Sequence, residues 1–233
     1  METKLKVKLL RYTSDPEDLI ATAARLCYSK ADIDELFEKM THEKSVDLLK
    51  KLIELGHESP TEHAIFTFAI EGVSRALTHQ LVRHRIASYS QQSQRYVKGS
   101  DFKYIIPPSI KKNKQAKDKF EKLMQLLAKE YDEFNKIAPN EDARFVLPNA
   151  AETKIIVTMN ARSLKNFFIR RCCERAQWEI RTLADEMLKL CRKVAPNLFG
   201  NIGPNCYYLG YCTEGKMTCG KAEEIKEKYK NLK

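Results

Sequence analysis

The sequence predicts an α+β fold, with a central antiparallel or mixed sheet flanked by helices and with a helical subdomain. Two β-branched and aromatic runs, at residues 64–70 and 154–159, have the composition of strands. Residues 114–137 place apolar side chains at helical spacing over a long stretch. Hydrophobic residues make up 43% of the 233-residue chain, which is enough for a core and excludes a disordered protein. We expect residues 1–233 to form one domain, with a cysteine-containing loop and basic tail at about 200–233.

The individual elements follow from local patterns, taken in chain order. A short strand at residues 4–12 precedes a helix that begins at Asp15-Pro16-Glu17, where an Asp cap is followed by proline, and that runs through Cys27. Apolar residues at helical spacing predict the next helix at residues 43–55, and Gly56 ends it. The remaining chain is expected to form a loop at 57–63, a strand at 64–70, a helix at 74–85, an irregular segment at 86–94, the long helix at 114–137, a short helix or turn at 141–146, a strand at 154–159, two helical stretches within 163–194 and a loop at 196–220.

The chain is strongly basic, with a formal net charge of +10 and a pI of about 9.2. This balance favours an anionic partner, which could be nucleic acid, a nucleotide, a phosphate-bearing cofactor or an acidic membrane. Much of the excess is expected to be solvated lysine on helix faces at residues 111–122 and 221–233. Residues 1–10 lack the apolar run of a signal peptide, and no run approaches the ~18 residues of a membrane span. We expect a cytoplasmic protein with no membrane partner.

The seven cysteines are an odd number, which argues against a disulfide framework. Cys206, Cys212 and Cys219 follow one another at intervals of six and seven residues, wider than the spacing of a zinc knuckle, and no histidine follows. Cys172-Cys173 lies in a predicted helix, where buried cysteine behaves as a small hydrophobic residue. From these spacings we expect no bound metal.

Residues 80–96 carry the densest set of candidate binding groups. Gln80, Arg83 and His84 are three and four residues apart, so a helix would place an amide, a guanidinium and an imidazole on one face. Short polar side chains follow as far as Arg95, and arginine forks match phosphate oxygens in pairs. The pattern predicts a nucleotide pocket, although a polar loop after a basic helix would have the same composition.

The string Arg83-His84-Arg85, seven further residues and then Ser93-x-Arg95 resembles the signature of the flavin-dependent thymidylate synthases. Other segments resemble that family in the same order, across roughly residues 4–200. They are Gly56-His57-Glu58-Ser59-Pro60 with Glu62-His63, Ala143-Arg144-Phe145-Val146-Leu147-Pro148, Asn160-Ala161-Arg162-Ser163-Leu164 with Asn166-Phe167, and Ala176-Gln177-Trp178-Glu179-Ile180.

The resemblance implies an enzyme that methylates dUMP to dTMP with a carbon from methylenetetrahydrofolate and a hydride from FAD, which NADPH reduces. It also implies a homotetramer whose active sites are shared between subunits. The residues expected to contact FAD are His57, Ser59, Arg83, His84, Arg85, Gln91, Asn160, Arg162 and Asn166. The residues expected to contact dUMP are Gln80, Arg83, Gln91, Gln92, Ser93, Gln94, Arg95, Arg144 and Arg171.

Arg171 is the candidate catalytic residue, because it falls where the family places the arginine that holds the uracil ring and promotes ionisation at N3. A guanidinium remains protonated at any working pH, so it favours a uracil anion electrostatically. The alternative role is an ion pair with Glu174 or Glu179. Arg170 and Arg175 are equally eligible by composition, and only the register counted from Asn160 selects Arg171.

The chain departs from the family pattern at two places. Ser90 and Gln91 stand where members often carry Asn and then Glu, so the contact of Gln91 with dUMP or flavin is an open question. Arg175 stands where other members can carry His.

Two other functions fit parts of the sequence. A nucleic-acid-binding module would account for the net charge, but no DNA-reading or RNA-reading motif is recognisable. A flavoprotein with another substrate would give no reason to keep the full dUMP set, which is Gln80, Arg83, Ser93, Arg95 and Arg171. We therefore expect dUMP to be the substrate and nucleic acid not to be a partner.

Overall fold

The computed structural model describes residues 1–232, and the chain divides into two compact units that each draw on three separate stretches. Unit 1 contains residues 1–6, 69–83 and 89–156, and unit 2 contains residues 7–68, 84–88 and 157 onward. One four-stranded sheet, in the order β1-β2-β4-β3, contributes strand residues to both units. Its strands are β1 (Lys6–Tyr12), β2 (Ile65–Ser74), β3 (Ser88–Gln91) and β4 (Glu152–Asn160).

The sheet pairs β2 with its two neighbours in the antiparallel sense. The bond from Thr13 N to Ile65 O joins the end of β1 to the start of β2, and the Lys6–Glu71 ion pair joins their opposite ends. Between β2 and β4, the Thr67 and Thr158 hydroxyls lie 2.9 Å apart. The predicted α+β class with an antiparallel sheet is therefore confirmed, while the prediction of a single domain stays a prediction.

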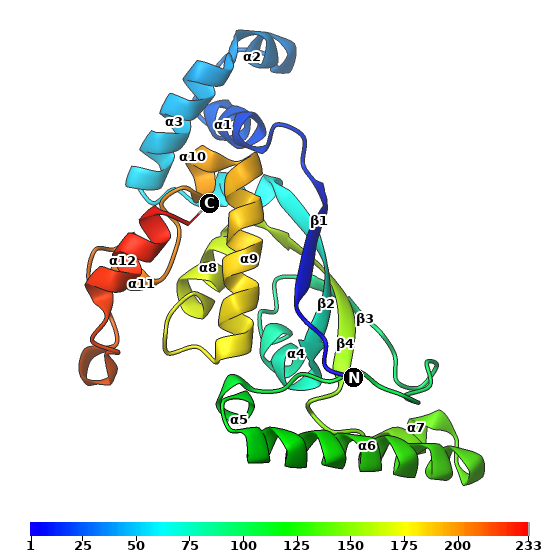
Figure 1. The fold of residues 1–233 in the computed structure, drawn as a ribbon. Helices are drawn as coiled ribbons and strands as arrows, with labels where there is room; N and C mark the ends of the chain where they lie inside the picture. Colours follow the sequence, from blue (N-terminus) through cyan, green and yellow to red (C-terminus); the bar gives the residue numbers. More distant parts are fainter. Residues whose placement is uncertain (233) are drawn as a thin grey trace. The chain divides into compact units, whose positions relative to one another are not determined.

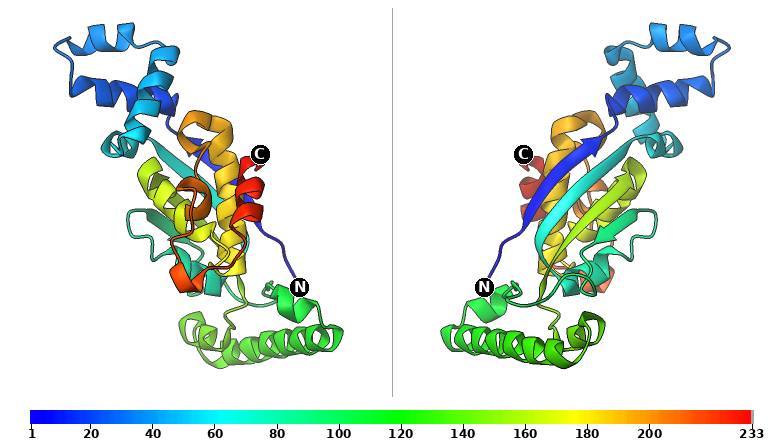
Figure 2. Two further views of the ribbon diagram at one scale, coloured as in Figure 1. Left: turned by 90° about the vertical axis from the view of Figure 1, so that its left-hand side faces the viewer. Right: turned by 90° about the vertical axis from the view of Figure 1, so that its right-hand side faces the viewer.

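Unit 2 holds most of the helices (Figure 1). They are α1 (Pro16–Leu26), α2 (Ile33–Lys39), α3 (His42–Glu54), the 3₁₀ turn η1 (Ser59–His63), α8 (Ala161–Arg171), α9 (Trp178–Val194), α10 (Pro196–Phe199), α11 (Asn205–Tyr208), the 3₁₀ turn η3 (Gly215–Met217) and α12 (Ala222–Lys230). Within this unit, α1, α2 and α3 pack together as a helical group (Figure 2). The core is aromatic, because Phe199 of α10 packs edge-on against Phe66 of β2 and Phe168 of α8.

Unit 1 is built around one long helix (Figure 1). Its helices are α4 (Arg75–Leu81), α5 (Pro108–Lys111), α6 (Lys114–Ile137), α7 (Asn140–Ala143) and the 3₁₀ turn η2 (Arg144–Val146). One face of α6 presents Phe120, Met124 and Leu127, which pack with Tyr104 and Ile106 into an apolar cluster. The apolar periodicity of this stretch predicted both ends of α6 correctly.

Gly72 marks a close approach of two backbones in unit 1. Its φ is +72°, and a Cβ at this position would lie 1.9 Å from the carbonyl oxygen of Lys4. Only glycine fits, since any other residue would meet both a left-handed backbone and a main-chain collision. The residues before Lys4 pair with Tyr104 through main-chain hydrogen bonds. Thr3 N donates to Tyr104 O, and Tyr104 N donates to Met1 O.

Two predictions in the signature region were wrong. The helix expected at 74–85 ends at Leu81, with a turn in which Arg83 N donates to Gln80 O, so Arg83 and His84 do not share a helix face with Gln80. The segment expected to be irregular at 86–94 contains strand β3, which is placed beside β4 in the sheet. The second error arises because β4, the pairing partner of β3, lies far away in the sequence.

Two smaller predictions also need correction. Asp15 begins α1 with φ of +44° and makes no side-chain cap hydrogen bond. The loop expected at 196–220 contains α10, α11 and η3. The basic tail forms α12, which carries its lysines on the outer helix face as expected and buries Ile225 and Tyr229 on the inner face. Among residues 1–232, no helix is both long and apolar enough to cross a membrane.

Candidate functional site

The signature segment passes from one compact unit to the other at the peptide bond between Arg83 and His84. The predicted site residues therefore fall into two groups. The unit-1 group consists of Gln80, Arg83, Gln91, Gln92, Ser93, Gln94, Arg95 and Arg144. The unit-2 group consists of His57, Ser59, His84, Arg85, Asn160, Arg162, Asn166 and Arg171. All residues predicted for dUMP except Arg171 lie in unit 1, and the flavin residues lie in unit 2 except Arg83 and Gln91.

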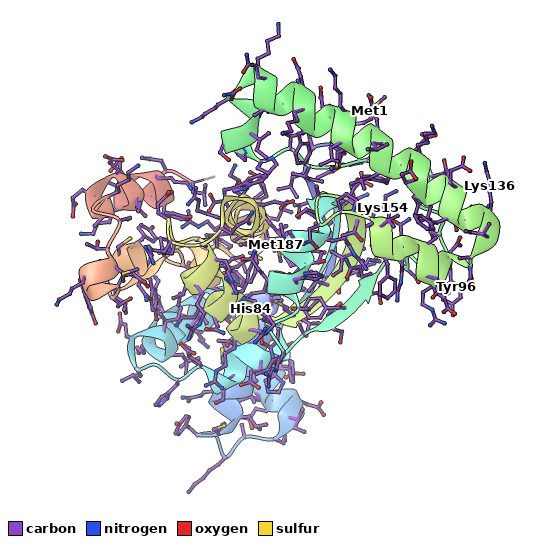
Figure 3. The ribbon with its side chains drawn as sticks, turned by 90° about the horizontal axis from the view of Figure 1, so that it is seen from below. Met1, His84, Tyr96, Lys136, Lys154 and Met187 are labelled. Carbon is purple, nitrogen blue, oxygen red and sulfur yellow. The ribbon has the colours of Figure 1, made fainter. Side chains whose placement is uncertain are left out.

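In the unit-1 group, Glu141 holds two arginines. Arg95 donates from Nε to its carboxylate at 2.9 Å and places a second nitrogen, NH2, 2.9 Å from the same oxygen. Arg144 donates from Nε to the main-chain oxygen of Glu141 at 3.1 Å. Asn140 adds a bond from its side-chain amide to Arg95 O. Two guanidiniums are thus held at one residue, which suits a dianionic phosphate. Figure 3 labels Tyr96, the neighbour of Arg95, near the end of α6 that carries Lys136.

Ser93 is oriented by the same loop. Its hydroxyl oxygen accepts from Arg95 N at 3.1 Å, so the hydroxyl hydrogen can be donated to an anion. The side chains of Arg83, Gln92 and Arg95 are exposed, whereas Gln80, Ser93 and Gln94 are half-buried.

Gln91 is anchored within unit 1. Its amide nitrogen donates to the hydroxyls of Thr78 at 3.0 Å and Thr153 at 3.1 Å. An amide nitrogen has two hydrogens, and both are used here. A ligand contact made by Gln91 would therefore pass through its carbonyl oxygen.

Arg75 is a candidate that the sequence reasoning missed. Burial lowers the pKa of its guanidinium, and the charge of Arg144 lowers it further. Its NH1 lies 3.5 Å from the Thr153 hydroxyl. Two like charges close enough to interact at a partly buried site are stabilised by an intervening anion. The sequence did offer a signal, since a cation is unfavourable in the first turn of a helix, where Arg75 stands.

In the unit-2 group, Arg171 contacts His84. Arg171 Nε donates to His84 Nε2 at 3.0 Å, and the imidazole packs edge-on against Phe167 with ring centroids 5.0 Å apart. Burial lowers the pKa of His84 to about 4, and the charges of Arg171 and Arg170 contribute. The ring is therefore neutral near pH 7 and acts as an acceptor. Figure 3 shows His84 beside the ribbon of α8.

The ion-pair alternatives for Arg171 receive no support from Glu174. That carboxylate pairs with NH1 of Arg181 at 2.9 Å. The neighbouring Arg170 donates instead to the Asn166 side chain at 3.0 Å. Burial lowers the pKa of the Arg171 guanidinium, as does the charge of Arg170, but the group stays charged at neutral pH. Arg171 is thus a half-buried cation whose Nε partner is a neutral ring.

Most of the remaining unit-2 residues lie at or next to η1 and the first two turns of α8, whereas Arg85 lies between α4 and β3. Asn160 caps α8 by accepting from Ser163 N at 2.8 Å. Arg162 donates from NH1 to Glu62 at 2.6 Å and lies 3.6 Å from Glu58. These exposed cations and amides, with His57, Ser59, Arg85 and Asn166, match the donors that a dinucleotide pyrophosphate requires.

Lys165 is a second residue that the sequence reasoning missed. It bonds to the Glu58 carboxylate and donates to the Tyr208 hydroxyl at 2.6 Å, with its ammonium 4.5 Å from the Tyr208 ring centroid. Burial alone would lower the pKa of this ammonium, but the two hydrogen bonds outweigh it and raise the pKa. Lys165 thereby fixes the loop that carries His57 and Ser59 onto α8. No motif in the sequence indicated it.

Comparison with known proteins identifies relatives over nearly the whole chain. The family model described as "Thymidylate synthase complementing protein" matches residues 8–197. The flavin-dependent thymidylate synthase of Geobacter sulfurreducens is 56% identical over 231 residues, covering 98% of this chain and 99% of that protein. That of Clostridium tetani is 54% identical over 242 residues, covering 97% of each.

A solved structure shares the fold at low identity. The UMP/dUMP methylase PolB from Streptomyces cacaoi, bound with 5-Br dUMP, superposes with a TM-score of 0.74 at 21% identity, covering 85% of this chain and 94% of that one. At this level of identity the likeness concerns the fold alone. From the family model and its curated relatives, the chain belongs to the flavin-dependent thymidylate synthase family.

Proposed function

We propose that this protein makes dTMP by reductive methylation of dUMP, with methylenetetrahydrofolate as the carbon donor and with FAD that NADPH reduces. The observation that carries the proposal is the 3.0 Å hydrogen bond from Arg171 to His84. It joins the candidate catalytic arginine to the middle of the signature, although the two residues are 87 positions apart. Bound FAD supplies the hydride chemistry that the protein side chains lack.

Arg171 binds the uracil ring and stabilises negative charge as N3 ionises. A permanently charged guanidinium in a partly desolvated site does this more strongly than it would in water. His84 is a positioning residue, because its neutral ring accepts from Nε and leaves the terminal nitrogens of Arg171 directed elsewhere. A protonated His84 would repel Arg171, so the low pKa of the imidazole suits this role.

The unit-1 group binds the phosphate of dUMP. Arg95 and Arg144 supply charge, Ser93 supplies a hydroxyl hydrogen, and Arg75 adds a third cation beside Arg144. The proposed contacts to FAD are made by the unit-2 group, with Arg83 and Gln91 from unit 1.

We further propose a cytoplasmic homotetramer with active sites shared between subunits. Phe145 is 83% exposed and Tyr96 is 80% exposed, and each directly follows a candidate phosphate-binding arginine. Large apolar side chains exposed next to a binding site support coverage by another copy of the chain. Because the proposed ligands are dUMP and FAD, we propose that nucleic acid is not a partner.

Turnover and flavin content test the proposal together. The purified protein should be yellow and should convert dUMP to dTMP with methylenetetrahydrofolate and NADPH. Arg171→Ala should lower kcat by about 10²–10³-fold, the usual loss when one electrostatic stabiliser is removed. FAD uptake should survive, and the exposed control Arg11→Ala should keep wild-type turnover. A colourless protein without turnover, or an Arg171→Ala variant of full activity, would refute the assignment.

A further inference from the structure

Four of the seven cysteines line one cavity in unit 2. The cavity has a volume of about 270 Å³, and its walls carry Cys173, Cys206, Cys212 and Cys219, called the cavity cysteines below. All four are free thiols, and Cys206 is buried. The sequence spacing of the last three argued against a zinc knuckle, but it could not reveal that Cys173 joins them from far upstream.

The fold holds the cavity cysteines on separate elements. Cys173 follows the end of α8, Cys206 lies in α11, and the other two lie in the loop before α12. Figure 1 shows α11 and α12 next to each other, and both α11–α12 and α8–α11 contacts occur. The loop reverses direction at Gly210 and Gly220, which have φ of +81° and +74°.

The loop is also tied to α11 by side chains. Asn205 donates from its amide to the Thr213 hydroxyl at 2.7 Å, next to Cys212. Gly220 N donates to the Thr218 hydroxyl at 3.2 Å, on either side of Cys219. All four cavity cysteines thus belong to the lining of one cavity.

The other cysteines have different surroundings. Cys27 is exposed at the end of α1, and Cys191 is fully buried in α9. Cys172 is buried, and its main-chain oxygen accepts from the Tyr229 hydroxyl. The gathering of four thiols in one cavity is therefore selective and is not a by-product of a cysteine-rich core.

We propose that the four cavity cysteines bind an iron–sulfur cluster. Four thiolates are the usual ligand set of such clusters, and a structural zinc site uses the same set. Among residues 1–232, no group of three or more His, Cys, Asp or Glu side chains is placed so that it could hold a single metal ion. A single zinc ion needs its sulfurs about 2.3 Å from one point, whereas a cluster spreads its ligands over several iron atoms. A cavity of about 270 Å³ with four cysteines in its lining has room for the larger group.

The charges around the cavity fit an anionic centre. Arg170, Arg171 and Arg175 line it together with the four cysteines, and Glu214 is the acidic residue on its wall. A cluster bound by four thiolates carries net negative charge, which the guanidiniums of Arg170 and Arg175 offset. Ile169 and Ile225 add apolar side chains to the lining. The presence of Arg171 places this site directly beside the proposed catalytic residue.

Metal and sulfide analysis of the full-length protein tests the proposal. The protein is purified without oxygen, or reconstituted with ferric iron and sulfide under a thiol reductant. We expect about two or about four iron atoms per chain, matched by inorganic sulfide. Reduction with dithionite should produce an iron–sulfur electron paramagnetic resonance signal, which a fully reduced flavin does not give.

Single substitutions then identify the ligands. Cys173→Ser, Cys206→Ser, Cys212→Ser and Cys219→Ser should each lose most of the iron, while the exposed control Cys27→Ser keeps it. Circular dichroism and FAD uptake check that each variant is folded. About one zinc per chain without iron would overturn the proposal, as would protein that takes up no metal. These readouts do not involve dUMP turnover, so failure here is distinct from failure of the proposed synthase activity.

Discussion

His84 carries two roles at the scale of the residue, as part of the signature and as the partner of Arg171. Its imidazole has a pKa of about 4 in the folded protein, below its ordinary 6.5, because it is partly buried and lies near two arginines. The unfolded chain therefore binds a proton that the folded protein rejects between these values. Stability attributed to His84 is full above pH 6.5 and falls as the pH drops toward about 4.

We predict that His84→Gln reduces the loss of stability as the pH falls from 6.5 to 4. Glutamine can still accept from Arg171 but does not titrate, so the free energy of unfolding should fall less steeply between pH 6.5 and pH 4. Urea unfolding of the flavin-free protein between pH 6.5 and pH 4 measures this free energy. The exposed His79→Gln variant should keep the wild-type slope. Equal slopes in all three proteins would show that His84 is not the group concerned.

The site residues differ in how far the sequence could predict them. Arg171 and His84 could be named from the resemblance, but their contact could not, because it joins a loop to the end of a helix. Arg75 and Lys165 match no motif, and their importance comes from burial beside other charges. For Gln91 the sequence left open whether it contacts dUMP or flavin. Its two threonine partners come from different elements of unit 1. Tertiary contacts of this kind have no local signal.

At the scale of the element, Gly72 offers a sharp test of strand packing. Gly72→Ala combines a left-handed backbone with a collision against Lys4, and it should lower the free energy of unfolding by about 2–5 kcal/mol. Gly56 has a similar φ of +70° but has nothing within 4 Å of its would-be Cβ. Gly56→Ala should therefore cost only about 1–2 kcal/mol. Urea unfolding compares the two, and equal losses would contradict the proposed collision.

Elements with a long internal pattern were predicted well, and those fixed by distant partners were not. Helix α6 repeats its apolar face over many turns, and β4 alternates buried and less buried residues along its length. By contrast, β3 has only four residues and depends on its place at the sheet edge. The end of α4 was missed because Val82 continues the apolar pattern one residue beyond Leu81.

At the scale of the whole molecule, the exposed Phe145 links assembly to the phosphate site. Phe145→Glu should reduce the mass of the particle measured by light scattering after gel filtration, since a charge cannot be buried in an apolar interface without a partner. Turnover should fall with the mass if active sites are shared. Phe145→Tyr keeps the aromatic ring and should retain both. An unchanged mass in Phe145→Glu would place the subunit interface elsewhere.

The cysteines show the limit of sequence reasoning at this scale. Judged by spacing along the chain, Cys206, Cys212 and Cys219 form one local set, whereas Cys173 lies in a predicted helix far upstream. Folding brings all four to one cavity because α8 and α11 contact each other. A motif with one distant member is invisible to a search for short spacings.

The change of unit at the Arg83–His84 bond has a consequence for how such enzymes can diverge. Because the two units interleave, the chain crosses between them at five points, near residues 6, 68, 83, 88 and 156. A single recombination event between two relatives would always leave at least one unit with segments of mixed parentage. The proposed nucleotide-binding and flavin-binding halves cannot be inherited as separate modules.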